Sequence, residues 1–522
     1  MAFPRPTPVK LVGALIAVSS VALNGAAVSS VTATAATAKE CRASLAGLDL
    51  QFVTIPQLTK ALASGKTSSR ELVQAYLARI RAYDGHVNSI RALNRHALRL
   101  AGKLDAERAA GRVRGPLHGI PILLKDNINT TDMPTTAGSI ALKGSIPLME
   151  ATITTKLEKA GAIILGKTNL SEFANWVDLS MPNGYSSLGG QVKNAYNLGD
   201  PSGSSSGSGV AGSMAFATGT VGTETSGSIL SPSEANSLVG IKPTTGLLSR
   251  FGILPLAPSF DTPGPMTRNV TDAAIMLGVM AGVDEKDERT ADSGDAPSDY
   301  SKFLKTNALK DVRLGYSPND LDGQGMFEKA LAVLEKQGAT LVETDTLSNT
   351  SLVGLTEIGL IPNEFKSSLN QYLAEQTPDS LRVRTLSDIV AYNEEHPDEV
   401  KYGQNLLIAS DAMPGVYHPA WAEPTIQSSR AAIDATLLAD DLAAIVAPGN
   451  TYANVSAAAG YPTVVVPAGY TGEGRNPFGL SFLADAFSEP DLISFAYDYE
   501  QATKLRVPPT DVNATLVPKR CG

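Results

Sequence analysis

A stretch rich in glycine, serine, threonine and alanine, residues 203–246, most constrains how this chain can fold. It holds two serine clusters, Gly-Ser-Ser-Ser-Gly-Ser-Gly at 203–209 and Gly-Thr-Glu-Thr-Ser-Gly-Ser-Ile at 222–229. A run of this composition is more often a flexible linker than a packed element. Apolar and alanine-rich flanks favour a buried segment here, and the small residues at 210–220 predict a closely packed helix. Such a run can also wrap backbone N–H groups around a phosphate or a reaction oxyanion.

The segments around this stretch predict alternating helices and strands. Ser68 and Glu71 form a capping-box pattern at the start of an amphipathic helix over 68–83. Residues 120–124 are a short apolar run that ends abruptly, which predicts a buried strand with Lys125 at its carboxyl end. Further elements are expected as a helix at 152–160 and strands at 162–165, 442–447 and 462–466. This alternation indicates one large α/β body.

The first 38 residues have the pattern of a secretory leader. Two basic residues precede an apolar stretch from 11 to about 27, and Ala-Thr-Ala at 36–38 matches a small-x-small cleavage site. We therefore expect a signal peptide at 1–38 and a secreted mature chain, extracellular or periplasmic, at 39–522. An N-terminal membrane anchor is the alternative, although its apolar core is short for the ~20 residues of a span.

Two cysteines, Cys41 and Cys521, stand at the two ends of the mature chain. In an exported protein they predict one disulfide that joins the termini, and two unpaired surface thiols are the alternative. Their spacing fits no metal site. The formal net charge is −9. Neither nucleic acid nor a membrane surface is expected as a partner of the mature chain, because both would repel an acidic protein.

The serine clusters fit no phosphate-binding motif, because neither a P-loop nor a dinucleotide-binding glycine pattern is present. Residues 203–207 do match the G-x-S-x-G nucleophile elbow, with Ser205 as the nucleophile. That motif needs an apolar strand before it, whereas 194–202 is polar. It also needs a downstream histidine, which would be His396 or His418. A Ser-His esterase or lipase of the α/β-hydrolase type therefore stays open as an alternative.

A series of short motifs resembles the amidase signature hydrolases, from about residue 53 to 506. These are Gly-Ile-Pro-Ile-Leu-Leu-Lys-Asp-Asn at 119–127, Gly-Lys-Thr-Asn-Leu-Ser-Glu-Phe at 166–173, the two serine clusters, Gly-Ile-Lys-Pro-Thr-Thr-Gly at 240–246, Phe-Asp-Thr-Pro-Gly-Pro-Met at 260–266, Gly-Tyr-Pro at 460–462 and Val-Pro-Ala-Gly at 466–469. The resemblance implies an α/β fold, a single large domain with a central mixed, twisted β-sheet covered by helices on both faces. The catalytic core would lie at about 53–283 and 441–506, with a variable insertion or cap at about 284–440.

The same resemblance implies a Ser-Ser-Lys triad. Lys125 would be the base, Ser204 the bridging serine that follows a cis peptide bond, and Ser228 the nucleophile. The oxyanion hole would be built from the backbone N–H groups of four residues, Thr225, Ser226, Gly227 and Ser228. The chain departs from the usual motifs at Ser202, Ser226 and Leu230, outside the three triad positions, so we expect these departures to alter specificity and not activity.

The chemistry of amide hydrolysis explains these residue types. A serine hydroxyl must lose its proton as it attacks. A lysine ammonium cannot accept that proton, so burial must hold Lys125 neutral. The hydroxyl of Ser204 can relay the proton, since it is donor and acceptor at once. No metal or cofactor is expected. In isolation, Lys125 would more often be an exposed lysine at a strand end, and the two serines ordinary loop residues.

The sequence thus predicts a secreted amidase, monomeric or homodimeric, that cleaves carboxylic amides or the C-terminal amide of peptides through an acyl-enzyme. Within the variable region, residues 364–372 and 402–404 are expected to line the entrance to the site. One alternative is an A-type amidotransferase protein that releases ammonia within a complex. Another is a catalytically silent binding protein.

Overall fold

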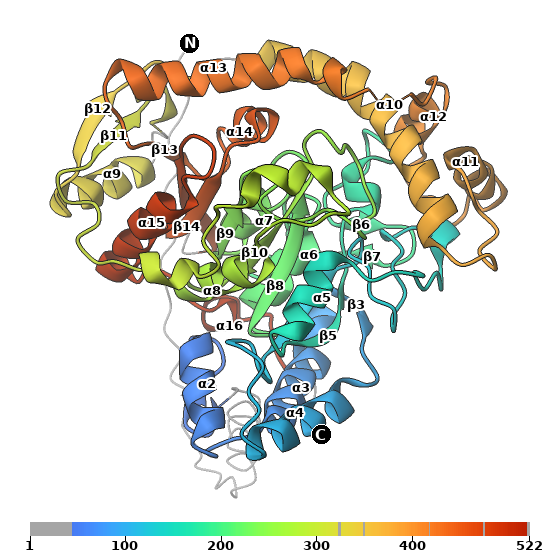
Figure 1. The fold of residues 1–522 in the computed structure, drawn as a ribbon, viewed down its shortest axis with the longest axis horizontal. Coiled ribbons are helices and arrows are strands. Elements are labelled where there is room, and N and C mark those ends of the chain that lie inside the picture. Colours follow the sequence, from blue (N-terminus) through green and yellow to red (C-terminus); the bar gives the residue numbers. More distant parts are fainter. Residues whose placement is uncertain (1–43, 322–324, 348–349, 417, 473–474, 519–522) are drawn as a thin grey trace, which may run out of the picture.

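The computed structural model describes residues 44–321, 325–347, 350–416, 418–472 and 475–518 (Figure 1). The predicted leader at 1–38 and both cysteines, Cys41 and Cys521, lie outside the described residues. The leader and the disulfide therefore stay predictions. Within the described ranges, no helix combines the length and the apolar character that crossing a membrane requires.

A mixed β-sheet, 11-stranded over the described residues, forms the centre of a single α/β domain (Figure 1). In spatial order its strands are β12 (Thr340–Glu343), β11 (Arg313–Tyr316), β13 (Ala444–Pro448), β15 (Asn476–Leu483), β14 (Thr463–Thr471), β9 (Val239–Lys242), β10 (Thr262–Thr267), β8 (Gly219–Glu224), β4 (Pro121–Lys125), β5 (Ile163–Thr168) and β3 (Ile90–Leu93). Strand β4 runs parallel to both of its neighbours, β5 and β8. From β8 through β10, β9, β14 and β15 to β13, adjacent strands are antiparallel.

Helices flank this sheet, as the sequence predicts. They are α2 (Ile55–Ala63), α3 (Ser69–Val87), α4 (Ala97–Ala109), α5 (Thr152–Lys159), α6 (Ser206–Ser213), α7 (Leu230–Ala235), α8 (Val270–Met280), α9 (Met326–Lys336), α10 (Thr350–Gln376), α11 (Leu386–Glu395), α12 (Asn405–Asp411), α13 (Glu423–Ala439), α14 (Ala453–Ala459), α15 (Glu489–Thr503) and α16 (Pro509–Val512). The long helices α13 and α10 form an arc along one side of the molecule, with α11 and α12 beside the far end of α10 (Figure 1). The range 284–440 contributes both this arc and the strands β11 and β12.

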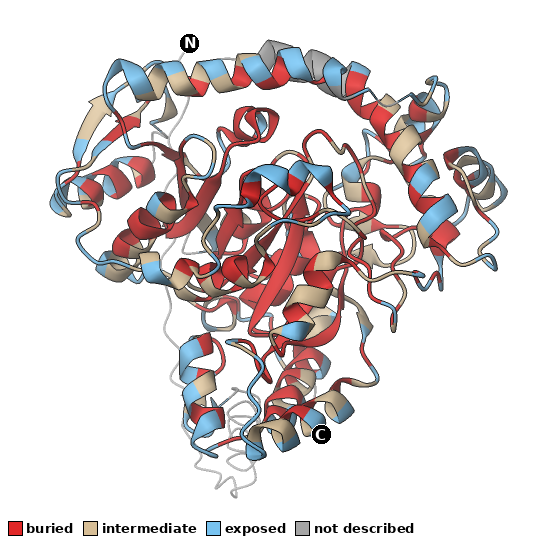
Figure 2. Ribbon diagram, in the orientation of Figure 1, coloured by how far each residue is buried: buried red, intermediate tan, exposed pale blue. Residues whose placement is uncertain are grey.

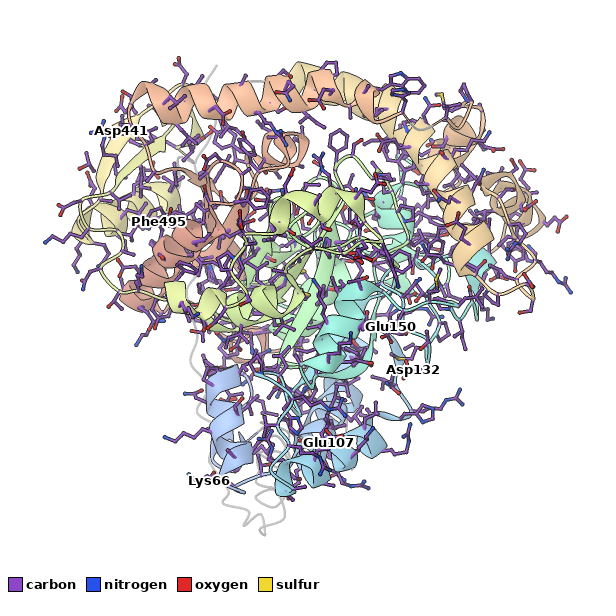
Figure 3. All side chains as sticks on the ribbon, in the orientation of Figure 1. Lys66, Glu107, Asp132, Glu150, Asp441 and Phe495 are labelled. Carbon is purple, nitrogen blue, oxygen red and sulfur yellow. The ribbon has the colours of Figure 1, made fainter. Side chains whose placement is uncertain are left out.

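The core is continuous along the sheet. Every residue of β4, β5, β8 and β10 is buried, and Figure 2 shows the central strands almost wholly buried while the helices expose one face. Aromatic contacts join helices to the strands. Phe495 of α15, which Figure 3 labels, lies 6.4 Å from Phe482 of β15 between ring centroids. Strands buried on both faces lose the alternating pattern of half-exposed strands.

The predicted elements form for the expected local reasons, with one exception. Helix α3 begins with the capping box, in which Ser68 Oγ accepts from Glu71 N at 3.1 Å and Glu71 Oε2 accepts from Ser68 N at 2.8 Å. Strand β4 ends at Lys125 as predicted. The predicted helix at 210–220 has wrong bounds, because α6 ends at Ser213 and β8 begins at Gly219. Three of the six residues of β8 are threonine or valine, whose branched side chains favour a strand.

Candidate active site

Lys125 lies at the carboxyl end of β4 with its side chain fully buried. Its Nζ is 2.8 Å from Ser204 Oγ, 2.9 Å from Thr223 Oγ1 and 3.2 Å from Thr223 O. Among the described residues it makes no ion pair. Burial lowers the pKa of Lys125 to about 7, against the opposing fields of Asp261 and Glu224. A neutral amine is therefore well populated near neutral pH.

The two predicted serines lie beside this amine. Ser204 Oγ contacts Lys125, and Ser204 N donates to Ser228 Oγ at 3.2 Å. Ser204 is 1% exposed and Ser228 is 9% exposed, so Ser228 is the more accessible of the two serines. The structure thus brings Lys125, Ser204 and Ser228 together, in that order of contact.

The cis peptide bond predicted before Ser204 is wrong. The described residues contain no cis peptide bond. Instead, Ser202 and Gly203 both take positive φ angles, 63° and 56°, and these two left-handed residues turn the chain toward Lys125. Ser204 reaches its position through this turn, after which α6 begins at Ser206.

The predicted oxyanion loop, residues 225–228, connects β8 to α7 and is held from two sides. Glu224 Oε2 accepts from the backbone N–H groups of Ile229 at 2.6 Å and Leu230 at 3.0 Å. On the other side, Thr225 Oγ1 donates to Asp261 Oδ1 at 2.5 Å. The hydroxyl of Ser226 donates to Asn454 Oδ1. Gly227 has a φ of 75°, which suits glycine and turns the loop toward α7.

A cavity of about 300 Å³ opens beside this loop. Thr223, Thr225 and Asn127 line its inner end, whereas Ser204 and Ser228 are not among its lining residues. One wall is formed by the segment 250–263, which is mainly apolar. Another part of the lining is a stripe of α10 with helical spacing, made of Ser368, Gln371, Tyr372, Glu375 and Gln376.

The entrance predicted at 364–372 and 402–404 stays a prediction, because the cavity is not lined by Ser204 or Ser228. Ser368, Gln371 and Tyr372 line the cavity, while residues 402–404 do not. The ring of Tyr402 packs instead against Tyr185, with centroids 4.7 Å apart.

The geometry gives no support to the Ser-His alternative. Ser205 Oγ donates to Thr223 O at 2.9 Å and accepts from Thr223 N at 3.1 Å. His396 Nδ1 contacts the carbonyl of Tyr392 at 2.8 Å, and His418 stacks on an exposed tryptophan. In the part of the chain that the structure describes, no histidine is bonded to Ser205, and no group of three or more His, Cys, Asp or Glu side chains is placed to hold a metal ion.

Two site residues were missed from the sequence. Thr223 contacts Lys125 twice, and Asp261 holds Thr225. Both stand within motifs that the sequence singles out, one in the second serine cluster and one in Phe-Asp-Thr-Pro-Gly-Pro-Met at 260–266. Their places within these motifs were the available signal. The contact of Thr223 with Lys125 depends on the pairing of β4 with β8, and that of Asp261 with Thr225 on the pairing of β8 with β10.

Known proteins resemble this chain over most of its length. Residues 71–411 match the family described as Amidase. The solved peptide amidase from Stenotrophomonas maltophilia is 40% identical, with a TM-score of 0.82 over 88% of this chain and 98% of that one. A probable amidase of Arabidopsis thaliana is 38% identical over 88% of this chain and 92% of its own. The A component of the glutamyl-tRNA(Gln) amidotransferase of Halorhodospira halophila is 32% identical over 86% of this chain and 97% of its own.

Proposed function

This chain belongs to the amidase family and is an amide hydrolase, and we propose that it cleaves peptide C-terminal amides through Lys125, Ser204 and Ser228. One observation carries the proposal. The buried amine of Lys125, which makes no ion pair within the described residues, lies 2.8 Å from Ser204 Oγ. The backbone N–H of Ser204 donates to Ser228 Oγ at 3.2 Å. A neutral amine, a relaying hydroxyl and a nucleophilic hydroxyl are the groups that acyl transfer without histidine needs.

In the proposed mechanism, Ser228 Oγ attacks the amide carbonyl carbon. The proton of Ser228 passes to Ser204 Oγ as the proton of Ser204 passes to Lys125 Nζ. Backbone N–H groups of residues 225–228 stabilise the negative oxygen of the tetrahedral intermediate. The C–N bond then breaks, Ser204 returns a proton to the departing amine, and water hydrolyses the ester on Ser228 by the reverse relay.

The cavity supports a peptide as the acyl group. Its volume of about 300 Å³ is at the small end of the range for ligand pockets, ~300–1,000 Å³. The α10 residues of the lining offer hydrogen-bonding side chains at successive turns, and the segment 250–263 offers apolar contact. An extended peptide needs both kinds of surface. The solved peptide amidase, at 40% identity, supports the same substrate class.

Two substitutions and a substrate panel test the proposal. Ser228→Ala and Lys125→Ala should each remove nearly all turnover, by about 10³-fold or more, with circular dichroism showing retained folding. Peptide C-terminal amides should be preferred over aryl amides and fatty amides in kcat/KM. Near wild-type rates for Lys125→Ala would refute the proton relay, and preference for long acyl chains would refute the peptide assignment.

A second candidate function is ammonia release within an amidotransferase complex of several chains, which the 32% match to a component of glutamyl-tRNA(Gln) amidotransferase favours. The purified chain alone should release ammonia from peptide amides if it is an independent amidase.

We also propose that the protein is exported after loss of residues 1–38. Mass spectrometry of the culture medium tests this, and recovery of the intact chain only from the cell interior would count against it.

A further inference from the structure

Asp261, on the cavity wall just before β10, accepts hydrogen bonds from two separate segments. Its Oδ1 accepts from Thr225 Oγ1 at 2.5 Å, and its Oδ2 accepts from Leu256 N at 2.8 Å and Ala257 N at 3.0 Å. Burial raises the pKa of Asp261 to about 6. The carboxyl group makes no hydrogen bond to Lys125, Ser204 or Ser228. Its direct contact with the predicted oxyanion loop is through Thr225, which begins the loop that ends at Ser228, while its charge also raises the pKa of Lys125.

The turn that carries Asp261 is held in its own right by the cavity helix. Glu364 of α10, fully buried, accepts from Ser259 N at 3.0 Å through Oε2 and from Ser259 Oγ at 2.6 Å through Oε1. Ala257 O closes the same turn, since it accepts from the N–H groups of Phe260 and Asp261 at 2.9 Å each. Glu364 lies one helical turn before Ser368, the first residue of α10 that lines the cavity.

We propose that Asp261 is a positioning residue for the loop at Ser228, and that Glu364 couples the substrate-facing helix α10 to this loop through Ser259. The inference rests on the proposed role of Ser228 as nucleophile. The chain of contacts runs from Glu364 to Ser259, through the turn at 257–261 to Asp261, and on to Thr225. Hydrogen bonds to a carboxylate are the stronger kind, and a shift of about 1 Å in catalytic groups can cost about 100-fold in rate.

The test uses a probe that needs no substrate. A fluorophosphonate phosphonylates an activated serine with loss of fluoride, and its phosphoryl oxygen gains negative charge in the transition state where an oxyanion would form. Its labelling rate at Ser228 therefore reports on the loop directly. Thr225→Val and Asp261→Asn should each lower this rate about 10- to 100-fold. Thr225→Ser, which keeps the hydroxyl, should label faster than Thr225→Val. Ser259→Ala and Glu364→Gln should lower the rate by smaller factors.

A matched control separates positioning from general loss of a buried carboxylate. Asp272 of α8 is also buried, accepts from Ile55 N at 2.7 Å and has a pKa raised by burial to about 6. Asp272→Asn should cost thermal stability while Ser228 labels at the wild-type rate. The double variant Thr225→Val with Asp261→Asn should label no more slowly than the slower single variant, because both remove one interaction.

The outcomes distinguish this inference from the proposed function. Wild-type labelling rates for Thr225→Val and Asp261→Asn would overturn the role of Asp261, and wild-type rates for both Ser259→Ala and Glu364→Gln would overturn the link to α10. On any amide that the wild type cleaves, Asp261→Asn should lower kcat by a larger factor than it raises KM. If Ser228 labels but no amide is cleaved, the proposed function fails while the labelling series still decides the inference. If Ser228 does not label, both fail.

Discussion

At the scale of single residues, Thr223 fixes the direction in which Lys125 can accept a proton. A neutral lysine amine has two N–H donors and one lone pair. The carbonyl of Thr223 can only accept, so one N–H of Lys125 points to it at 3.2 Å. If the second N–H points to Thr223 Oγ1 at 2.9 Å, the lone pair faces Ser204 Oγ. Asn127 Nδ2 donates to the same threonine hydroxyl at 3.0 Å, which leaves the second lone pair of this hydroxyl to accept from Lys125.

Thr223→Val should therefore slow acyl transfer, because the lysine amine loses one of the two acceptors that orient it. We expect kcat to fall about tenfold or more, with Thr223→Ser closer to wild type since the serine keeps the hydroxyl. Steady-state kinetics on the preferred amide would measure both variants. Equal kcat values for the valine and serine variants would show that the hydroxyl does not orient Lys125.

The pH dependence of turnover should follow the titration of Lys125. The pKa of Lys125 is lowered to about 7 by burial. The base must be neutral, so kcat/KM should be low at about pH 5.5 and rise to a plateau above about pH 8. Initial rates across this range would locate the midpoint. Lys125→Arg, whose side chain stays charged, should be inactive at every pH, and a flat wild-type profile would contradict the assignment of Lys125 as base.

At the scale of secondary-structure elements, Gly207 allows α6 to lie against Asn169, the residue that follows β5. A Cβ on Gly207 would meet the carbonyl oxygen of Asn169 at 2.1 Å, and the backbone there cannot move aside without moving α6. Helix α6 directly follows Ser204 and Ser205. The approach of α6 therefore sets where Ser204 lies relative to Lys125.

Gly207→Ala should consequently destabilise the fold and reduce activity strongly, by several kcal/mol and more than tenfold in kcat. Gly102→Ala in α4 is the matched control, because nothing lies closer than 4.0 Å to its added Cβ. In a helix interior that change should raise the free energy of unfolding by about 1 kcal/mol. Urea denaturation and kinetics of both variants would decide, and an active, stable Gly207→Ala protein would mean that α6 can shift freely.

Elements with strong local signals were predictable, and those built from small residues were not. The capping box fixes the start of α3, and the apolar run of β4 ends at Lys125, so both were found from the sequence. Strand β8 is fully buried but contains glycine, threonine and glutamate, so it shows neither alternation nor an apolar run. The contacts of Thr223 and Asp261 depend on this strand and its neighbours, and they could not be derived without the sheet.

At the scale of the whole molecule, the order of strands assembles the site from distant parts of the chain. Strands β4 and β8 are parallel neighbours, with Leu124 opposite Val221, so their carboxyl ends lie at one edge of the sheet. Parallel strands buried on both faces place functional residues at that edge. The sequence indicates some of the strands, namely β4, β5, β13 and β14, but the spatial order of the sheet is set by long-range packing that no local pattern records.

Buried carboxyl groups distributed over the molecule should make its stability depend on pH. Burial raises the pKa of Glu172, Glu364 and Glu500 to about 7 each. Between about pH 4.5 and 7 the folded chain thus binds more protons than the unfolded chain, and the free energy of unfolding falls as pH rises. The Tm should be higher at about pH 5.5 than at about pH 7.5. Thermal melts at intervals of half a pH unit would measure the slope.

Glu500→Gln tests the origin of this slope, because the amide can keep a neutral acceptor for Val270 N, which Glu500 accepts at 2.9 Å, without titrating. The variant should lose less Tm over the same pH interval than the wild type. Glu328→Gln, on the exposed face of α9, should keep the wild-type slope. A Tm that rises with pH across this interval would mean that these carboxyl groups are ionised in the folded protein. Their buried hydrogen bonds would then have to stabilise the charge more than burial destabilises it.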